Sequence, residues 1–173
     1  GRTQLATLSG HGDEVRGMAF SPDGALLAGA GADQTVRVWD VGEATDVAVL
    51  EGHSAEVNNV AFNPGGELLA SCSGGILERF TVRLWDVETW TEIAVLEGHE
   101  GQIVGLAFSP DGDVLASHGA GGTLRLWDVK GHQELAVLRT ARGMIGGGAI
   151  FSPDGRLLVS GGGDGVIRFW GVE

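Results

Sequence analysis

The seven residues TVRVWDV at positions 35–41 return three more times along the chain, and this repetition decides the fold. TVRLWDV occupies 81–87, TLRLWDV occupies 123–129 and VIRFWGV occupies 166–172, so the four tryptophans stand 46, 42 and 43 residues apart. The alternation of apolar and polar residues within each copy is typical of a β-strand with two different faces. A sequence period of this length indicates stacked units that each bury their apolar faces against a neighbour.

Two further markers recur in step with the first. FSPDG stands at 20–24, 108–112 and 151–155, with FNPGG at 62–66, and a Leu-x-Gly-His segment stands at 8–11, 50–53 and 96–99, with LRTA at 138–141. In the FSPDG segment, proline presets φ, aspartate hydrogen-bonds the local backbone and glycine supplies positive φ. This segment therefore predicts a hairpin turn. In the first unit we expect strands at 15–20, 26–30 and 47–50 around the strand that carries Trp39. No stretch shows helical periodicity, so each unit is predicted to be a four-stranded antiparallel meander of an all-β protein.

The order of these markers resembles the WD40-repeat family over essentially the whole chain. The resemblance implies a β-propeller, and it implies a hydrogen-bonded tetrad of histidine, Ser or Thr, aspartate and tryptophan in each blade. No repeat here keeps all four members. In the first repeat Gly29 replaces the Ser, and in the third Gly121 replaces the Asp. In the second repeat an insertion replaces the turn that carries the Asp. In the fourth the histidine is missing, and Thr140 and Ala141 stand near its place. The members retained are His11, Asp33 and Trp39; His53, Ser71 and Trp85; His99, Ser117 and Trp127; and Ser160, Asp164 and Trp170.

Four repeats raise the question of how the ring closes. We expect one domain, 1–173, with blades at about 9–50, 51–96, 97–138 and 139–173, and a strand at 4–8 that completes the last blade, as the resemblance implies. Ordinary blade angles would make the chain half of an eight-bladed ring, with an apolar face open at each end. A second copy related by two-fold symmetry would close this ring. The rival interpretation is a fragment, natural or engineered, of a longer propeller.

Several positions are candidates for binding a partner. Residues beside the start of each first strand differ between repeats while the framework repeats, as a recognition surface would, although plain sequence drift would also produce this. They are Glu14, Arg16, Glu56, Asn58, Gln102 and Val104. The insertion GGILERF contributes three apolar candidates, Ile76, Leu77 and Phe80, which are equally compatible with a tolerated loop. Trp90, outside the repeated positions, is a weaker candidate of the same kind.

Composition and motifs favour binding over catalysis. The net charge of −12 disfavours nucleic acid and anionic membranes as partners. Cys72 is the single cysteine, which excludes an internal disulfide and a cysteine zinc site, and His118 and His132 are expected at the surface or in turns. No motif of a hydrolase, metalloprotease or phosphate loop is present.

We therefore predict a soluble, cytoplasmic protein that is not an enzyme and needs no cofactor or metal. Its predicted function is a protein-protein interaction scaffold that binds itself and an unknown protein or peptide. The alternative is a self-assembling propeller fragment with no dedicated ligand.

Overall fold

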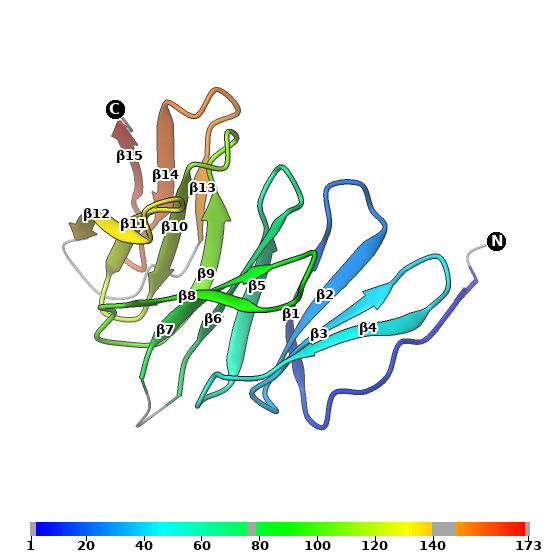
Figure 1. Ribbon diagram of the computed structural model, residues 1–173. Coiled ribbons are helices and arrows are strands. Elements are labelled where there is room, and N and C mark those ends of the chain that lie inside the picture. The colour runs from blue at the N-terminus through cyan, green and yellow to red at the C-terminus, as the bar shows by residue number, and fades with distance from the viewer. Residues whose placement is uncertain (1–2, 76–78, 140–147, 172–173) are drawn as a thin grey trace.

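The computed structural model describes residues 3–75, 79–139 and 148–171, and these residues form fifteen strands and no helix. The strands fall into four antiparallel sheets that follow one another along the chain (Figure 1). They are β1 (Val15–Phe20), β2 (Leu26–Gly31), β3 (Val36–Asp40) and β4 (Thr45–Leu50); β5 (Val57–Phe62), β6 (Leu68–Ser73), β7 (Thr81–Asp86) and β8 (Glu92–Glu97); β9 (Ile103–Phe108), β10 (Val114–Gly119), β11 (Thr123–Asp128) and β12 (Gln133–Arg139); and β13 (Ala149–Phe151), β14 (Leu157–Gly161) and β15 (Ile167–Gly171).

Each sheet is a meander in which consecutive strands pair as neighbours. The tight turn between the first two strands is held by local hydrogen bonds; in the first sheet Ser21 Oγ donates to Asp23 Oδ1 over 2.6 Å, and the amide of Gly24 donates to the Ser21 carbonyl. Gly24 has a φ of 75°, a conformation that favours glycine. The all-β class and the blade-like sheets expected from the repeats are thus present.

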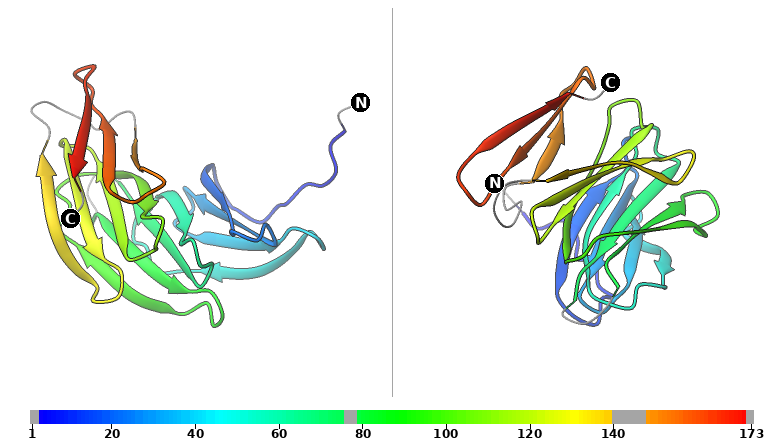
Figure 2. Two further views of the ribbon diagram at one scale, coloured as in Figure 1. Left: turned by 90° about the horizontal axis from the view of Figure 1, so that it is seen from above. Right: turned by 90° about the vertical axis from the view of Figure 1, so that its left-hand side faces the viewer.

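The sheets stand side by side in an open arc, with β1 to β4 at one end and β13 to β15 at the other (Figure 2). A separate core fills each space between neighbours. Between the first and second sheets, Val36 and Val38 of β3 pack with Val60 of β5 and Leu69 of β6. The equivalent cores of the next two junctions centre on Leu84 with Ile103 and on Leu124 with Leu158. Stability therefore depends on contact between sheets, as the repeat pattern requires.

One expectation about the last sheet is not met within the single chain. The fourth sheet has three strands among the described residues, because residues 3–10, including the expected strand at 4–8, lie in no strand. This segment leaves the first sheet and runs away from the arc, so it lies far from β15 (Figure 1). An arc that does not close cannot bring its first strand to its last sheet. Completion of the last blade by 4–8 stays a proposal, as does its pairing with a second chain.

His118 is a correction to the sequence interpretation. It lies in β10, 6% exposed, at the position that Ala30 and Cys72 occupy in the sheets before it, whereas His132 is exposed in a turn with a φ of 53°. No helix of the described residues has the length and apolarity that crossing a membrane requires. A cytoplasmic location stays a prediction.

Candidate functional site

The tryptophan-bearing strands of the second and third blades are tied to their neighbours by one buried serine each. Trp85 Nε1 donates to Ser71 Oγ over 2.8 Å, and Ser71 Oγ lies 2.7 Å from His53 Nε2, so the hydroxyl that accepts from the indole can donate to the imidazole. Trp127, Ser117 and His99 repeat this arrangement with distances of 2.8 and 2.7 Å. A buried indole N–H and a buried imidazole both need partners, and one hydroxyl serves both.

The absence of the aspartate affects the histidine Nδ1 differently in these two blades. In the second blade, Thr81 Oγ1 lies 3.4 Å from His53 Nδ1. In the third, where Gly121 stands in the turn, His99 Nδ1 is buried without a hydrogen-bond partner. Burial, with the charge of Arg83, lowers the pKa of His53 to about 3. Burial, with Arg125 and His118, lowers the pKa of His99 to about 4. Both imidazoles are therefore neutral at physiological pH.

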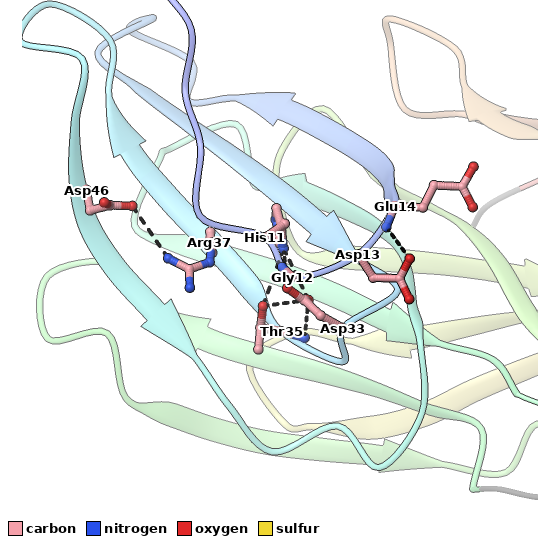
Figure 3. Close-up of polar contacts among 8 residues, drawn as sticks. All are labelled: His11, Gly12, Asp13, Glu14, Asp33, Thr35, Arg37 and Asp46. Carbon is pink, nitrogen blue, oxygen red and sulfur yellow. Dashed lines mark hydrogen bonds and ion pairs between the residues drawn. The ribbon is translucent and has the colours of Figure 1, made fainter.

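The first blade keeps the aspartate and lacks the serine. His11 Nδ1 lies 3.0 Å from Asp33 Oδ2, and Asp33 also accepts hydrogen bonds from the Gly12 amide and from Thr35 Oγ1, each over 2.7 Å (Figure 3). Burial alone would raise the pKa of Asp33, but the hydrogen bonds from Thr35, Gly12 and His11 outweigh it and lower this pKa to about 2. On the other side of the ring, where Gly29 replaces serine, His11 Nε2 and Trp39 Nε1 are both buried without a partner.

The fourth blade keeps the serine contact and uses its aspartate differently. Trp170 Nε1 donates to Ser160 Oγ over 3.0 Å. Asp164 pairs with Arg168, whose Nη2 lies 2.5 Å from Asp164 Oδ2, and the hydrogen bond from Arg168 lowers the pKa of Asp164 to about 2. Thr140 and Ala141, which stand near the missing histidine, lie outside the described residues. The retained tetrad positions thus meet within the first three blades, whereas in the fourth blade Ser160 and Trp170 meet and Asp164 pairs with Arg168 instead.

Three of the candidate partner-binding residues meet at the rim of the arc. Arg16 Nη1 lies 2.7 Å from Glu56 Oε2 and donates to Asn58 Oδ1 over 3.1 Å, which links the first two blades. Asn58 Nδ2 in turn donates to the carbonyl of Ile103 over 2.8 Å. A depression of about 440 Å³ lies here, lined by Arg16, Gln34, Ser54, Ala55, Glu56, Gly75 and Gln102. Glu14 is exposed beside it, and Val104 is half-buried and does not line it.

The insertion places Phe80 partly against the core. Phe80 is half-buried and packs against the core between the second and third blades. Ile76 and Leu77 lie outside the described residues. Trp90 is also half-buried, against the core between the first two blades, in a turn where its own φ is 57°.

Two groups of exposed apolar side chains lie at the two ends of the arc. The leading face, on the first blade, consists of Val15, Met18, Phe20 and Leu27. Met18 is 69% exposed, whereas Val60, its counterpart in the second blade, is 3% exposed because it packs against the first blade. An apolar hollow of about 430 Å³ is lined by Met18, Ala19, Phe20 and Leu27.

The trailing face, on the fourth blade, consists of Ile150, Val159, Ile167 and Phe169. Ile167 is 66% exposed and Phe169 is 68% exposed. Their counterparts in the three blades before are buried by the next blade: Val36, Val82 and Leu124 for Ile167, and Val38, Leu84 and Leu126 for Phe169. The sequence predicted an open apolar face at each end but did not single out these residues. Their repeat positions could have identified them, since each matches a core position of an inner blade.

Metal-binding and thiol chemistry have no site on these surfaces within the described part of the chain. Among the described residues, no three histidine, cysteine, aspartate or glutamate side chains are placed to hold a metal ion. Cys72 is fully buried, and burial raises the pKa of its thiol. The surfaces that remain are the polar rim and the two apolar faces, which suit binding to macromolecules.

Comparison with known proteins agrees with the repeat count. The family described as "WD domain, G-beta repeat" matches residues 2–40, 44–86, 90–128 and 130–171. Human Striatin-4 is 61% identical over 33 residues, which are 19% of this chain and 4% of Striatin-4. Lissencephaly-1 homolog 1 of Paramecium tetraurelia is 46% identical over 41 residues, 24% of this chain and 10% of that protein. An uncharacterised WD repeat-containing protein of Synechocystis is 47% identical over 38 residues, covering 21% of this chain and 11% of the relative. The aligned part is thus about one repeat and a small part of each relative's length.

Proposed function

Because the chain belongs to the WD40 repeat family, we propose that it is a non-catalytic protein-interaction scaffold whose copies associate by the leading face of one and the trailing face of another. The observation that carries this proposal is the exposure of Met18, Ile167 and Phe169 at positions that the inner blades bury. Removing such side chains from water stabilises a contact by about 1.5–3 kcal/mol each. Soluble proteins rarely leave apolar patches of this kind uncovered without a binding role.

The geometry of the inner junctions indicates how two copies would meet. Within the chain, the trailing side of each blade packs on the leading side of the next, as Val38 of β3 does on Val60 of β5. The same contact between two chains would place Phe169 of one copy against Met18 of the other. In a ring of two chains a head-to-tail contact of this type occurs twice, so no end face stays open. Two chains of four blades would give eight, within the size range of propellers.

The proposal predicts that one charged side chain on the trailing face prevents association. Phe169→Asp removes apolar area and buries a carboxylate without a partner, so we expect the dissociation constant to rise at least 100-fold. Leu135→Asp is the matched control, because Leu135 is 55% exposed on the outer strand β12, away from both end faces. Sedimentation equilibrium should give dimers for the unchanged chain and for Leu135→Asp, and monomers for Phe169→Asp. A monomeric unchanged chain, or dimers for all three, would contradict the proposal.

Binding at the rim depression distinguishes an interaction scaffold from a self-assembling fragment that has no ligand. Arg16 and Gln102 line this depression. Neither residue belongs to the leading face or to the trailing face. A scaffold should retain a specific protein from a lysate of its source, and the double change Arg16→Ala and Gln102→Ala should abolish this retention while dimers persist. Retention of nothing, or equal retention by both chains, would favour the alternative of a self-assembling fragment.

A further inference from the structure

The turn that follows β5 differs from the turns that follow β1, β9 and β13. In those three FSPDG turns the serine hydroxyl accepts a hydrogen bond from an amide of the next strand and donates to the aspartate two residues on, over 2.5–2.6 Å. In the second sheet Asn63 and Gly65 replace this serine and this aspartate. Asn63 Oδ1 accepts from the amides of Gly66 and Leu68 over 2.9 and 3.0 Å, so the turn itself is kept.

The exchange leaves Asn63 with an unused hydrogen-bond donor. Asn63 is 4% exposed, and its Nδ2 group, which carries two N–H bonds, donates to none of the described residues. The aspartate that could accept from it is absent, because Gly65 stands at that position. A Cβ atom at Gly112 would lie 3.8 Å from Asn63 Nδ2, so this group faces the turn of the third blade. Nearly buried polar groups have partners as a rule, so an acceptor from outside the chain is expected here.

A hollow of about 350 Å³, the junction hollow, lies between the second and third blades at this point. It is lined by Asn63, Gly65, Glu67, Leu68, Asp111, Gly112, Asp113, Val129, Lys130 and His132. Because β5 begins beside the rim depression and ends just before Asn63, the junction hollow lies on the opposite rim, among the hairpins that join the first two strands of each sheet (Figure 1). The equivalent hollow between the first and second blades is smaller, about 200 Å³, and its Ser21 and Asp23 already bond to each other.

The charges around the junction hollow favour a cationic ligand. Three carboxylates line it, those of Glu67, Asp111 and Asp113, against one ammonium group, that of Lys130. Glu67 and Asp113 are exposed, and neither forms an ion pair with a described residue. The net charge of −12 on the whole chain attracts cations to the same surface. The ligand must therefore present a positive group close to a hydrogen-bond acceptor, and an extended basic peptide has both.

We propose that the junction hollow binds an extended basic segment of a partner protein. Asn63 Nδ2 donates to a main-chain carbonyl of this segment, and Glu67 and Asp113 pair with its lysine or arginine side chains. Ligand pockets hold about 300–1,000 Å³, so a hollow at the lower end of this range takes one side chain and its adjoining backbone. The site is neither the rim depression nor an end face. The inference therefore goes beyond the proposed function and does not depend on self-association.

Asn63→Asp tests the role of the amide. The change keeps the oxygen that accepts from Gly66 and Leu68, so the turn should persist, but it turns the Nδ2 donor into an acceptor. The probe is a fluorescein-labelled peptide of alternating arginine and alanine, and its binding to the full chain is measured by fluorescence anisotropy. We expect the dissociation constant to rise by about tenfold or more, although the variant has one more negative charge than the unchanged chain.

The carboxylates are tested with a second variant and a matched control. Glu67→Gln combined with Asp113→Asn should also raise the dissociation constant by about tenfold or more. Glu43→Gln combined with Glu51→Gln removes two exposed carboxylates that do not line the hollow, and should change the dissociation constant by less than about twofold. A labelled peptide of alternating glutamate and alanine should not bind.

Each contrary outcome overturns the inference. Binding of the basic peptide to Asn63→Asp as tightly as to the unchanged chain, or more tightly, would show that negative charge alone attracts it. Equal weakening by the control pair would show the same. No binding of the basic peptide, or equal binding of the acidic one, would also overturn the site. Phe169→Asp should bind the basic peptide as the unchanged chain does, so failure of the proposed self-association leaves this test intact.

Discussion

Ser71→Ala tests whether the shared hydroxyl holds the second blade together. Ser71 is fully buried, and its Oγ lies 2.8 Å from Trp85 Nε1 and 2.7 Å from His53 Nε2. Alanine removes both hydrogen bonds and leaves an indole N–H and an imidazole nitrogen without partners in a dry core. Each bond contributes about 0.5–1.5 kcal/mol, and each stranded group adds a desolvation cost of about 1–3 kcal/mol. Because the two terms overlap, we expect the free energy of unfolding to fall by about 2–4 kcal/mol.

The measurement is urea denaturation at neutral pH, followed by tryptophan fluorescence and by far-ultraviolet circular dichroism at one protein concentration. With a slope of about 2 kcal/mol per molar urea, the midpoint should fall by about 1–2 M. Ser117→Ala should do the same, because its hydroxyl has the same two contacts in the third blade. Ser160→Ala is the graded control. It loses one bond of 3.0 Å to the partly exposed Trp170 and should cost about 1 kcal/mol.

The reasoning would be refuted by a loss below 0.5 kcal/mol for Ser71→Ala, a threshold set at the lower limit of about 0.5 kcal/mol for one hydrogen bond. Equal losses for Ser71→Ala and Ser160→Ala would also refute it, since the cost would then not follow the number of buried partners.

The same network makes two further predictions. Gly29→Ser should raise the free energy of unfolding by about 1–2 kcal/mol in urea denaturation, because the new hydroxyl would partner Trp39 Nε1 and His11 Nε2, which are both unpaired now. To make room for the new side chain, the ring centroids of His11 and Trp39, 5.6 Å apart, must separate to the 6.4 Å seen in the second and third blades. A loss of stability would show that the two rings cannot move apart. The neutral His53 and His99 should make stability depend on pH, because their pKa values of about 3 and 4 lie below the value of about 6.5 in the unfolded chain. Their contribution to the free energy of unfolding is complete above pH 6.5 and is lost as the pH falls toward the folded pKa values, by about 2 kcal/mol each at pH 5. When both histidines are replaced by glutamine, the urea midpoint of unfolding should change less between pH 6.5 and 5.

Much of the fold could be predicted because the repeat carries its own local physics. The alternation in TVRVWDV and the turn chemistry of SPDG specify strands and hairpins within a few residues, and their recurrence indicates sheets stacked on one another. The structure confirms the all-β class, the family comparison confirms the WD40 repeats, and Val15–Phe20 forms the strand expected there. These features depend on contacts between residues close in sequence or one blade apart.

The remaining features depend on neighbours that a pattern cannot specify. His118 looks like an isolated polar residue, yet it lies in β10 at the position that Ala30 and Cys72 occupy in the sheets before it, and it is 6% exposed. Phe80 lies in an irregular insertion, and part of its apolar side chain packs on the core between the second and third blades. Whether Ile167 and Phe169 are core or surface depends on whether a further blade covers the fourth, and the repeat itself does not specify this.

The mass of the unchanged chain in solution decides whether its end faces join two copies. Sedimentation velocity over a hundredfold range of concentration should show one species with twice the chain mass of 17.9 kDa, since the two head-to-tail contacts close the ring. A stable species of one chain would show that the end faces need no cover. A ladder of ever larger assemblies would show that they meet without closing.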